Sequence, residues 1–244
     1  MKAPSLEQID ALISKTWPAE SILHTPPVTL RFGVGGQRAS AATVDSPITP
    51  EQLRAAEDAM KERGEFLFRI RHRQDDLDRL LSDQGYARRD PTNILLGPTS
   101  EILSTGRASV TAFAIWPPLG IMKNIWTEND VDEHRQAIME RAPHPKVAIL
   151  GRGNAKPGGV AFASADTGIA MIHAVAVQKD LRRQKIAQSM MVAIAEWANS
   201  NDIPWIATLC TENNTIARRL YQSLGMKIVG QYHYRAKVYE RREL

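Results

Sequence analysis

The chain has 244 residues, of which 43% are hydrophobic and 24% are charged, a composition typical of globular proteins. Its 15 glycines and 14 prolines are too few for a fibrous or a largely disordered chain. The net charge of +4 permits an anionic ligand but does not by itself indicate a nucleic-acid partner.

Other features argue against membrane, secreted and metal-dependent classes. The longest stretch without a charged side chain, residues 108–122, is too short for a membrane span and contains two prolines. The N-terminus has no apolar signal region. Cys210 is the single cysteine, so an intrachain disulfide and a thiolate zinc cluster are both excluded. We expect a cytoplasmic protein with no metal and no membrane or nucleic-acid partner.

The first part of the chain, residues 1–104, predicts an α/β unit. Leu6, Ile9, Ile13 and Trp17 recur at helical spacing and indicate a first helix. Thr49 has the residue type of an N-cap and is followed by proline, which indicates a second helix. The other elements expected here are strands at 28–32, 39–44, 66–70 and 93–96 and a helix around 77–81.

A boundary is expected at 101–106, and the pattern restarts in the second part, residues 105–244. Strands are expected at 110–115, 147–150, 159–162, 169–177, 205–209 and 227–234. Helices are expected at 121–126, from 128 onward, at 183–199 and at 214–224, with a turn at 151–154 and a solvated tail at 240–244. This order predicts an α+β domain with a mixed, mostly antiparallel sheet.

A basic turn between a strand and a helix is the first candidate site. Lys179, Arg182, Arg183 and Lys185 are accompanied by one acid, Asp180. The first turn of the helix that follows has unpaired N–H groups and the positive end of the helix dipole. The segment therefore has the chemistry of a pyrophosphate site, although a solvated basic turn would have the same composition.

Two motifs together resemble a known family. Arg182-x-x-Lys185-x-Ala187 resembles the R/Q-x-x-G-x-G/A acyl-CoA signature of the GNAT superfamily of N-acetyltransferases. The string from Asn214 to Met226 matches that superfamily's second motif, N-x-x-A-x-x-L-Y-x-x-x-G-[FM], at each fixed position. The resemblance covers roughly residues 108–244 and implies a GNAT fold in which acetyl-CoA donates an acetyl group to an amine.

One residue departs from the first motif. Lys185 stands where the family usually has glycine, which lets the backbone approach the phosphates. We expect Lys185 to adopt a helical φ, keep its N–H available and add a cation. The residues that the resemblance implies for acetyl-CoA binding are Val175, Ala176, Val177, Arg182, Arg183, Gln184, Lys185, Ile186, Ala187, Asn214, Ala217 and Tyr221.

The resemblance also implies catalytic roles. Tyr221 matches the family's general acid, which protonates the departing thiolate; a core aromatic is the alternative. A bulge in the strand at 171–177 would free a backbone N–H near 175–177 for the thioester oxygen. His173 is the first candidate base, because its local sequence looks like that of arylalkylamine N-acetyltransferases. A buried structural histidine, Glu212 as the base and proton loss through water remain alternatives.

The first part of the chain shows a weaker likeness. Leu80-Leu81-x-x-x-Gly85-Tyr86 faintly resembles the end of the second motif, and no acyl-CoA signature precedes it. We interpret residues 1–104 as a degenerate GNAT-like or accessory domain that shapes the acceptor site.

The predicted function is an N-acetyltransferase acting by direct attack in a ternary complex, as a monomer or homodimer. The alternative is a non-catalytic acyl-CoA-binding regulatory module. The acceptor would be a primary amine on a small molecule or a peptide. It would be cationic if Glu128, Asp130, Asp132 and Glu133 attract it, but the same acids could instead complement a helix dipole.

Overall fold

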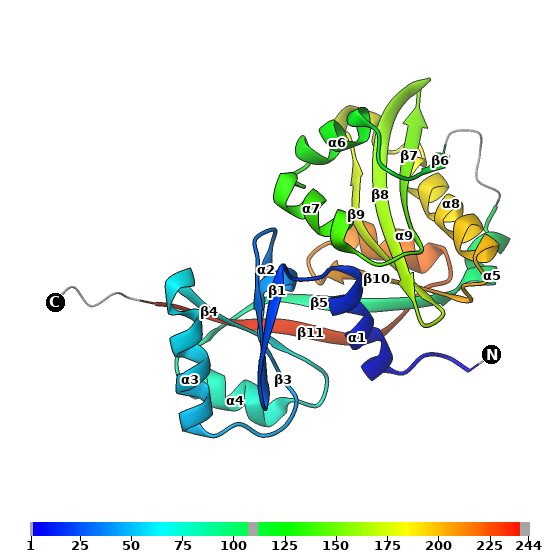
Figure 1. The fold of residues 1–244 in the computed structure, drawn as a ribbon. Helices are drawn as coiled ribbons and strands as arrows, with labels where there is room; N and C mark the ends of the chain where they lie inside the picture. The colour runs from blue at the N-terminus through cyan, green and yellow to red at the C-terminus, as the bar shows by residue number, and fades with distance from the viewer. Residues whose placement is uncertain (1, 107–111, 240–244) are drawn as a thin grey trace.

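The computed structural model describes residues 2–106 and 112–239 (Figure 1). The strands are β1 (Ser21–Thr25), β2 (Val28–Phe32), β3 (Thr43–Val44), β4 (Glu65–Ile70), β5 (Ala87–Pro98), β6 (Ala112–Ile115), β7 (Lys146–Gly153), β8 (Lys156–Asp166), β9 (Ile169–Val177), β10 (Trp205–Thr211) and β11 (Lys227–Val238). The helices are α1 (Leu6–Thr16), α2 (Gln37–Ser40), α3 (Pro50–Met60), α4 (Asp75–Asp83), α5 (Thr99–Ser104), α6 (Gly120–Thr127), α7 (Glu133–Arg141), α8 (Ile186–Ser200) and α9 (Thr215–Ser223). The short 3₁₀ helices are η1 (Lys61–Arg63) and η2 (Lys179–Leu181).

The predicted α+β class with a mixed, mostly antiparallel sheet is confirmed, with local corrections. Residues 37–40 form α2, so β3 is much shorter than the expected strand at 39–44. The expected boundary at 101–106 is largely helix α5. The glycine-rich segment 151–153 continues β7 and leaves the turn to residues 154 and 155. Residues 107–111 and 240–244, part of an expected strand and the expected tail, lie outside the described residues.

Two helix starts also differ from expectation. The helix expected from residue 128 begins at Glu133, because the Asp132 side chain accepts a hydrogen bond from the Arg135 N–H and caps it. The helix expected from 183 begins at Ile186, because the basic turn before it is not helical.

The two halves of the chain repeat one strand and helix order. In the first half β3, α3, β4, α4 and β5 follow one another, and in the second half β9, α8, β10, α9 and β11 do so. β9 and β10 pair in parallel, and the first half has a parallel bridge between Ala42 and Phe68 at the matching place. The first half is therefore built on the same plan as the second.

The halves exchange their last strands. The large sheet has the order β4-β11-β5-β10-β9-β8-β7-β6, so β5 lies between β10 and β11, and β11 lies between β5 and β4. Neither half has a complete sheet without the other. The expected division into two domains, residues 1–104 and 105–244, stays a prediction, and it concerns the two repeated parts of the chain.

Helices cover both faces of the sheet (Figure 1). Residues of α5, α8 and α9 pack on one face, where Ile149, Ala161 and Ile172 belong to the same buried cluster. On the other face α1 packs beside Met171 and Ala207, and α6 and α7 pack on Ala148 and Phe162. Alternation along the strands therefore places apolar side chains on both faces of the sheet.

Candidate functional site

The strands β9 and β10 diverge in the middle of the sheet. Their parallel pairing covers Ile169–Ile172 and Trp205–Thr208 only, and β9 then continues to Val177. The expected bulge is present, because the pairing with β8 shifts register between His173 and Ala176, and Ala174 has a φ of 49°. Residues 175–177 are half-buried along this opening. Such partial burial suits backbone groups that would face a bound thioester.

The basic turn lies between the open end of β9 and helix α8. Arg182, Arg183, Gln184 and Lys185 are exposed, whereas Ile186 is buried and anchors the helix. Lys185 occupies the N-cap position, and no side chain caps the helix there. The first turn of α8 contains no acid either. Its N–H groups are therefore available to an anion in the midst of several cations.

The expectation of a right-handed helical φ at Lys185 is wrong. Lys185 has φ 61° and ψ 13°, in the left-handed region that favours glycine. The left-handed backbone at this position gives a reason for the family's usual glycine, because glycine adopts this conformation without steric cost. Arg183 is also left-handed, with a φ of 66°.

Close packing holds the turn and α8 against the sheet. A Cβ atom on Gly158 would lie 2.3 Å from the Leu181 side chain, and one on Gly153 would lie 2.6 Å from the Ile186 side chain. These glycines therefore let the turn and the start of α8 approach β7 and β8, a role that is structural and not phosphate binding.

Tyr221 reaches the point where the strands part. Its side chain is buried and its hydroxyl interacts with Thr208, the last residue of β10 that pairs with β9. Burial raises the pKa of Tyr221 to about 12, so the phenol stays protonated at neutral pH. A protonated donor at this place suits the predicted role, which remains a proposal.

Two other motif residues, Asn214 and Ala217, stabilise the start of α9. Asn214 is the N-cap, and its side chain accepts a hydrogen bond of 3.1 Å from the Ala217 N–H. Cys210 lies nearby and its thiol donates to the Asn214 carbonyl at 3.3 Å. Burial raises the pKa of Cys210, which suits a core cysteine better than a nucleophile.

His173 is buried with both ring nitrogens engaged. Nδ1 lies 2.8 Å from Nη1 of Arg38, which can only donate, so Nδ1 is the acceptor. Nε2 then carries the proton and donates to the Thr16 hydroxyl at 2.9 Å. Burial and the Arg38 charge hold the pKa of His173 well below its usual value. The side chain is thus a neutral link between α1 and Arg38, with no lone pair left for a substrate proton.

A cavity of about 420 Å³ opens at the divergence on the face covered by α1. Ala174 from β9 and Leu209 from β10 line one side of it. The remaining wall includes Trp17, Gly35, Gly36, Arg38, Asp90, Thr92, Arg135, Tyr232 and Tyr234. Most of these residues come from the first half or from β11, and the sequence analysis missed them.

The side chains of Glu212 and of the four acids at 128–133 are not among those that line this cavity, although Val131 and Thr211 are. The Glu212 side chain is exposed, and Thr211 rather than Glu212 lines the cavity. Asp132 caps α7, and Glu128 accepts a hydrogen bond of 2.8 Å from Gln178. The wall has Arg135 but none of the acids at 128, 130, 132 and 133. Capping therefore accounts for Asp132, and attraction of a cationic acceptor stays untested.

Across residues 2–106 and 112–239, no cluster of three His, Cys, Asp or Glu side chains could hold a metal ion. Within the same ranges, none of the helices combines the length and the apolar character that crossing a membrane requires.

Comparison with known proteins identifies a family for part of the chain. Residues 113–226 match the acetyltransferase (GNAT) family model. A GCN5-related N-acetyltransferase from Kribbella flavida superposes with a TM-score of 0.73 at 14% identity, covering 96% of both chains. A functionally unknown conserved protein from Staphylococcus epidermidis gives 0.69 at 10% identity, over 92% of this chain and 96% of that one.

A tandem GNAT protein from the clavulanic acid biosynthesis pathway gives a TM-score of 0.62 at 11% identity, over 97% of this chain and 89% of that one. At these identities the likeness concerns the fold, which is that of a tandem GNAT protein. No curated protein sequence matches the chain significantly.

Proposed function

Since residues 113–226 form a domain of the GNAT acetyltransferase family, we propose that the chain transfers an acetyl group from acetyl-CoA to a primary amine. The amine attacks the thioester directly while both substrates are bound. The observation that carries the proposal is the uncapped start of α8, set among Arg182, Arg183 and Lys185 at the end of the diverging strands.

The matching helix of the first half supports this assignment by contrast. At the start of α3 the Thr49 side chain accepts a hydrogen bond from the Gln52 N–H, and the Gln52 side chain accepts one from the Thr49 N–H. Residues 45–49 before α3 contain no basic side chain. The start of α3 thus offers neither the uncapped N–H groups nor the cations of the α8 turn, and we place the acetyl-CoA site in the second half alone.

The chemistry assigned to the site follows from the opening. The pantetheine arm would enter between β9 and β10, with the thioester oxygen toward the backbone N–H groups at 175–177. Tyr221 would donate its proton to the thiolate as the carbon–sulfur bond breaks. The acceptor amine would attack from the cavity on the opposite face.

The amine must lose a proton before it attacks, because a free amine has a pKa near 10.4. His173 has no free lone pair, and the exposed Glu212 does not line the cavity. Of the routes left open by the sequence, proton loss through water in the cavity is therefore the one we favour. His173 would act as a positioning residue that holds Arg38 in the cavity wall.

A panel of primary amines incubated with acetyl-CoA tests the proposal, with free thiol release as the readout. Thiol release that depends on both the amine and Tyr221 supports the enzyme. Calorimetric binding of CoA without thiol release for any amine class would support the alternative, a regulatory acyl-CoA-binding module.

A further inference from the structure

The first half contains a cavity of its own, of about 550 Å³. It opens beside Thr43 and Asp45 at the end of β3 and Arg69 and Arg71 at the end of β4. The cavity of about 420 Å³ from which the acceptor amine would attack, here called the acceptor cavity, opens in the same way beside the ends of β9 and β10. Because the two halves repeat one plan, the first cavity lies where the acceptor cavity of that half would lie. Tyr232 of β11 lines both.

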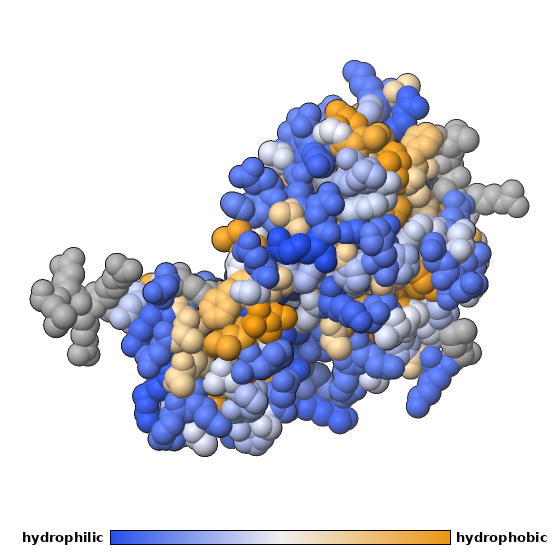
Figure 2. Space-filling view, in the orientation of Figure 1, coloured by the Kyte–Doolittle hydropathy of each residue, from blue (hydrophilic) through white to orange (hydrophobic). Residues whose placement is uncertain are grey.

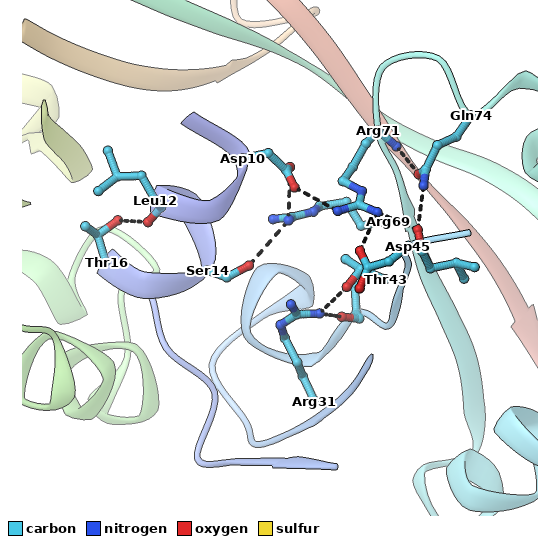
Figure 3. A network of polar contacts seen from close by, with 12 residues as sticks. Asp10, Leu12, Ser14, Thr16, Arg31, Thr43, Asp45, Arg69, Arg71 and Gln74 are labelled. Carbon is cyan, nitrogen blue, oxygen red and sulfur yellow. Dashed lines mark hydrogen bonds and ion pairs between the residues drawn. The ribbon is translucent and has the colours of Figure 1, made fainter. Parts of the chain in front are cut away.

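Three guanidinium groups gather in this cavity (Figure 3). Arg69 is 2% exposed and Arg31 is 8% exposed, and Arg71 lies next to them at the edge. Burial, and after it the charge of Arg69, lowers the pKa of Arg31 to about 10. Arg31 also donates to the Ala41 carbonyl and the Thr43 hydroxyl.

The three carboxylates that line the cavity are less buried than Arg31 and Arg69. Asp10 is the least exposed of them and is partly buried, and it pairs with Arg69 at 3.0 Å and with Arg71 at 3.3 Å. Asp45 pairs with Arg71, but its side chain is 62% exposed, and Glu7 at the rim is exposed as well. The buried part of the cavity therefore holds an excess of positive charge.

The Arg69 guanidinium has one donor that is not used in a hydrogen bond. One guanidinium nitrogen, Nη2, binds Asp10 and the Ser14 hydroxyl, and the guanidinium lies over the Tyr232 ring at 5.7 Å. Its Nε is buried and has no hydrogen-bond partner. A network that served only to fasten α1 to β4 would not require a buried donor without an acceptor beside a cavity of this size.

The other walls of the cavity are apolar. Leu6, Ile22 and Ile94 line it, and Ile22 lies on the fully exposed strand β1 with 51% of its surface accessible. Figure 2 shows apolar surface in the region where β1 lies in Figure 1. A ligand for this cavity thus needs an anionic group for the arginines and an apolar body for these side chains.

We propose that the first half binds a small organic anion, with its carboxylate or phosphate group at Arg69 and its apolar body toward Ile22. Carboxylate and phosphate share the oxygen geometry that a guanidinium fork recognises. The site is separate from the acetyl-CoA site and does not depend on the proposed transferase activity.

Calorimetric titration of the full chain without CoA tests the site. The probes are benzoate and phenyl phosphate, with benzyl alcohol as the uncharged analogue. We expect at least one anion to bind with a Kd of about 1 mM or tighter and at least tenfold more tightly than benzyl alcohol. Binding of benzoate alone would identify the ligand as a carboxylate, and binding of phenyl phosphate alone would identify it as a phosphate. Binding of both would mean that the site recognises the chemistry that the two anions share. An anion affinity no greater than that of benzyl alcohol would overturn the proposal.

Two variants locate the binding. Arg69→Gln should weaken anion binding about tenfold or more, whereas Arg54→Gln, which removes an exposed arginine of α3, should not. Ile22→Trp should block the cavity, whereas Leu23→Trp changes the next, equally exposed residue of β1, which does not line it. If Arg69→Gln does not fold, Ile22→Trp decides. Wild-type affinity in the folded variants at both 69 and 22, or in Ile22→Trp when it alone folds, would refute the site.

Discussion

Lys185→Gly separates the two contributions of this residue, its charge and its backbone conformation. Lys185 has a φ of 61°, and a left-handed conformation costs a non-glycine residue about 1–2 kcal/mol. The greater freedom of glycine in the unfolded chain offsets about 0.5–1 kcal/mol of that gain. We expect a net stabilisation of about 0.5–1 kcal/mol, which corresponds to a Tm higher by about 1–4 °C in a chain of this size.

The same change removes one exposed cation from the predicted pyrophosphate site. Exposed charge pairs contribute about 0.2–1 kcal/mol, so CoA affinity should fall by no more than about fivefold. Lys179→Gly is the matched control, because Lys179 is also an exposed lysine of this turn but lies in η2, outside the left-handed region. It should lower the Tm, since glycine gains no conformational relief there.

Thermal unfolding followed by circular dichroism and calorimetric CoA titration measure both effects. A Tm that falls in Lys185→Gly as it does in Lys179→Gly would refute the backbone explanation of the family's glycine.

Three further outcomes are expected. Arg182→Glu with Arg183→Glu should weaken CoA binding severely in calorimetry while leaving the Tm nearly unchanged, because both side chains are exposed. An unchanged affinity would mean that the CoA phosphates do not bind at this turn. Tyr221→Phe should lower kcat more than it raises the KM for acetyl-CoA, because the proton is needed only as the thiolate leaves; a change in KM alone would make the tyrosine a packing residue. Burial depresses the pKa of His173, so the unfolded chain takes up a proton that the native state refuses below about pH 6.5. Stability should therefore fall by up to about 1.4 kcal/mol per pH unit from this group as the pH falls below about 6.5, and urea unfolding of His173→Gln should lack that part of the slope.

The elements nearest the chemistry could be predicted because local signals determine them. An apolar run bounded by turns specified β9 at Ile169–Val177, and Asn214 in an N-cap position marked the start of α9. The first motif follows β9 in the chain and the second contains α9, so the family resemblance and the local structure agreed.

The exchange of β5 and β11 could not be predicted, because hydrophobic periodicity identifies a strand without specifying its neighbours. The cavity that we propose for the acceptor was missed for the same reason. Arg38 meets His173 across 135 positions of sequence, and no local pattern marks either residue for the other. The sequence places His173 on a strand beside the site but does not indicate its contact with Arg38, so it favoured His173 as a base.

The central claim is that one acetyl-CoA site exists per chain, at the uncapped start of α8, and that the capped α3 of the first half provides none. Calorimetric titration of the wild-type chain with CoA measures this stoichiometry directly. The account predicts one CoA per chain, and the Arg182→Glu, Arg183→Glu variant should weaken that binding severely. Two CoA molecules per chain, or one whose binding survives those substitutions, would contradict it.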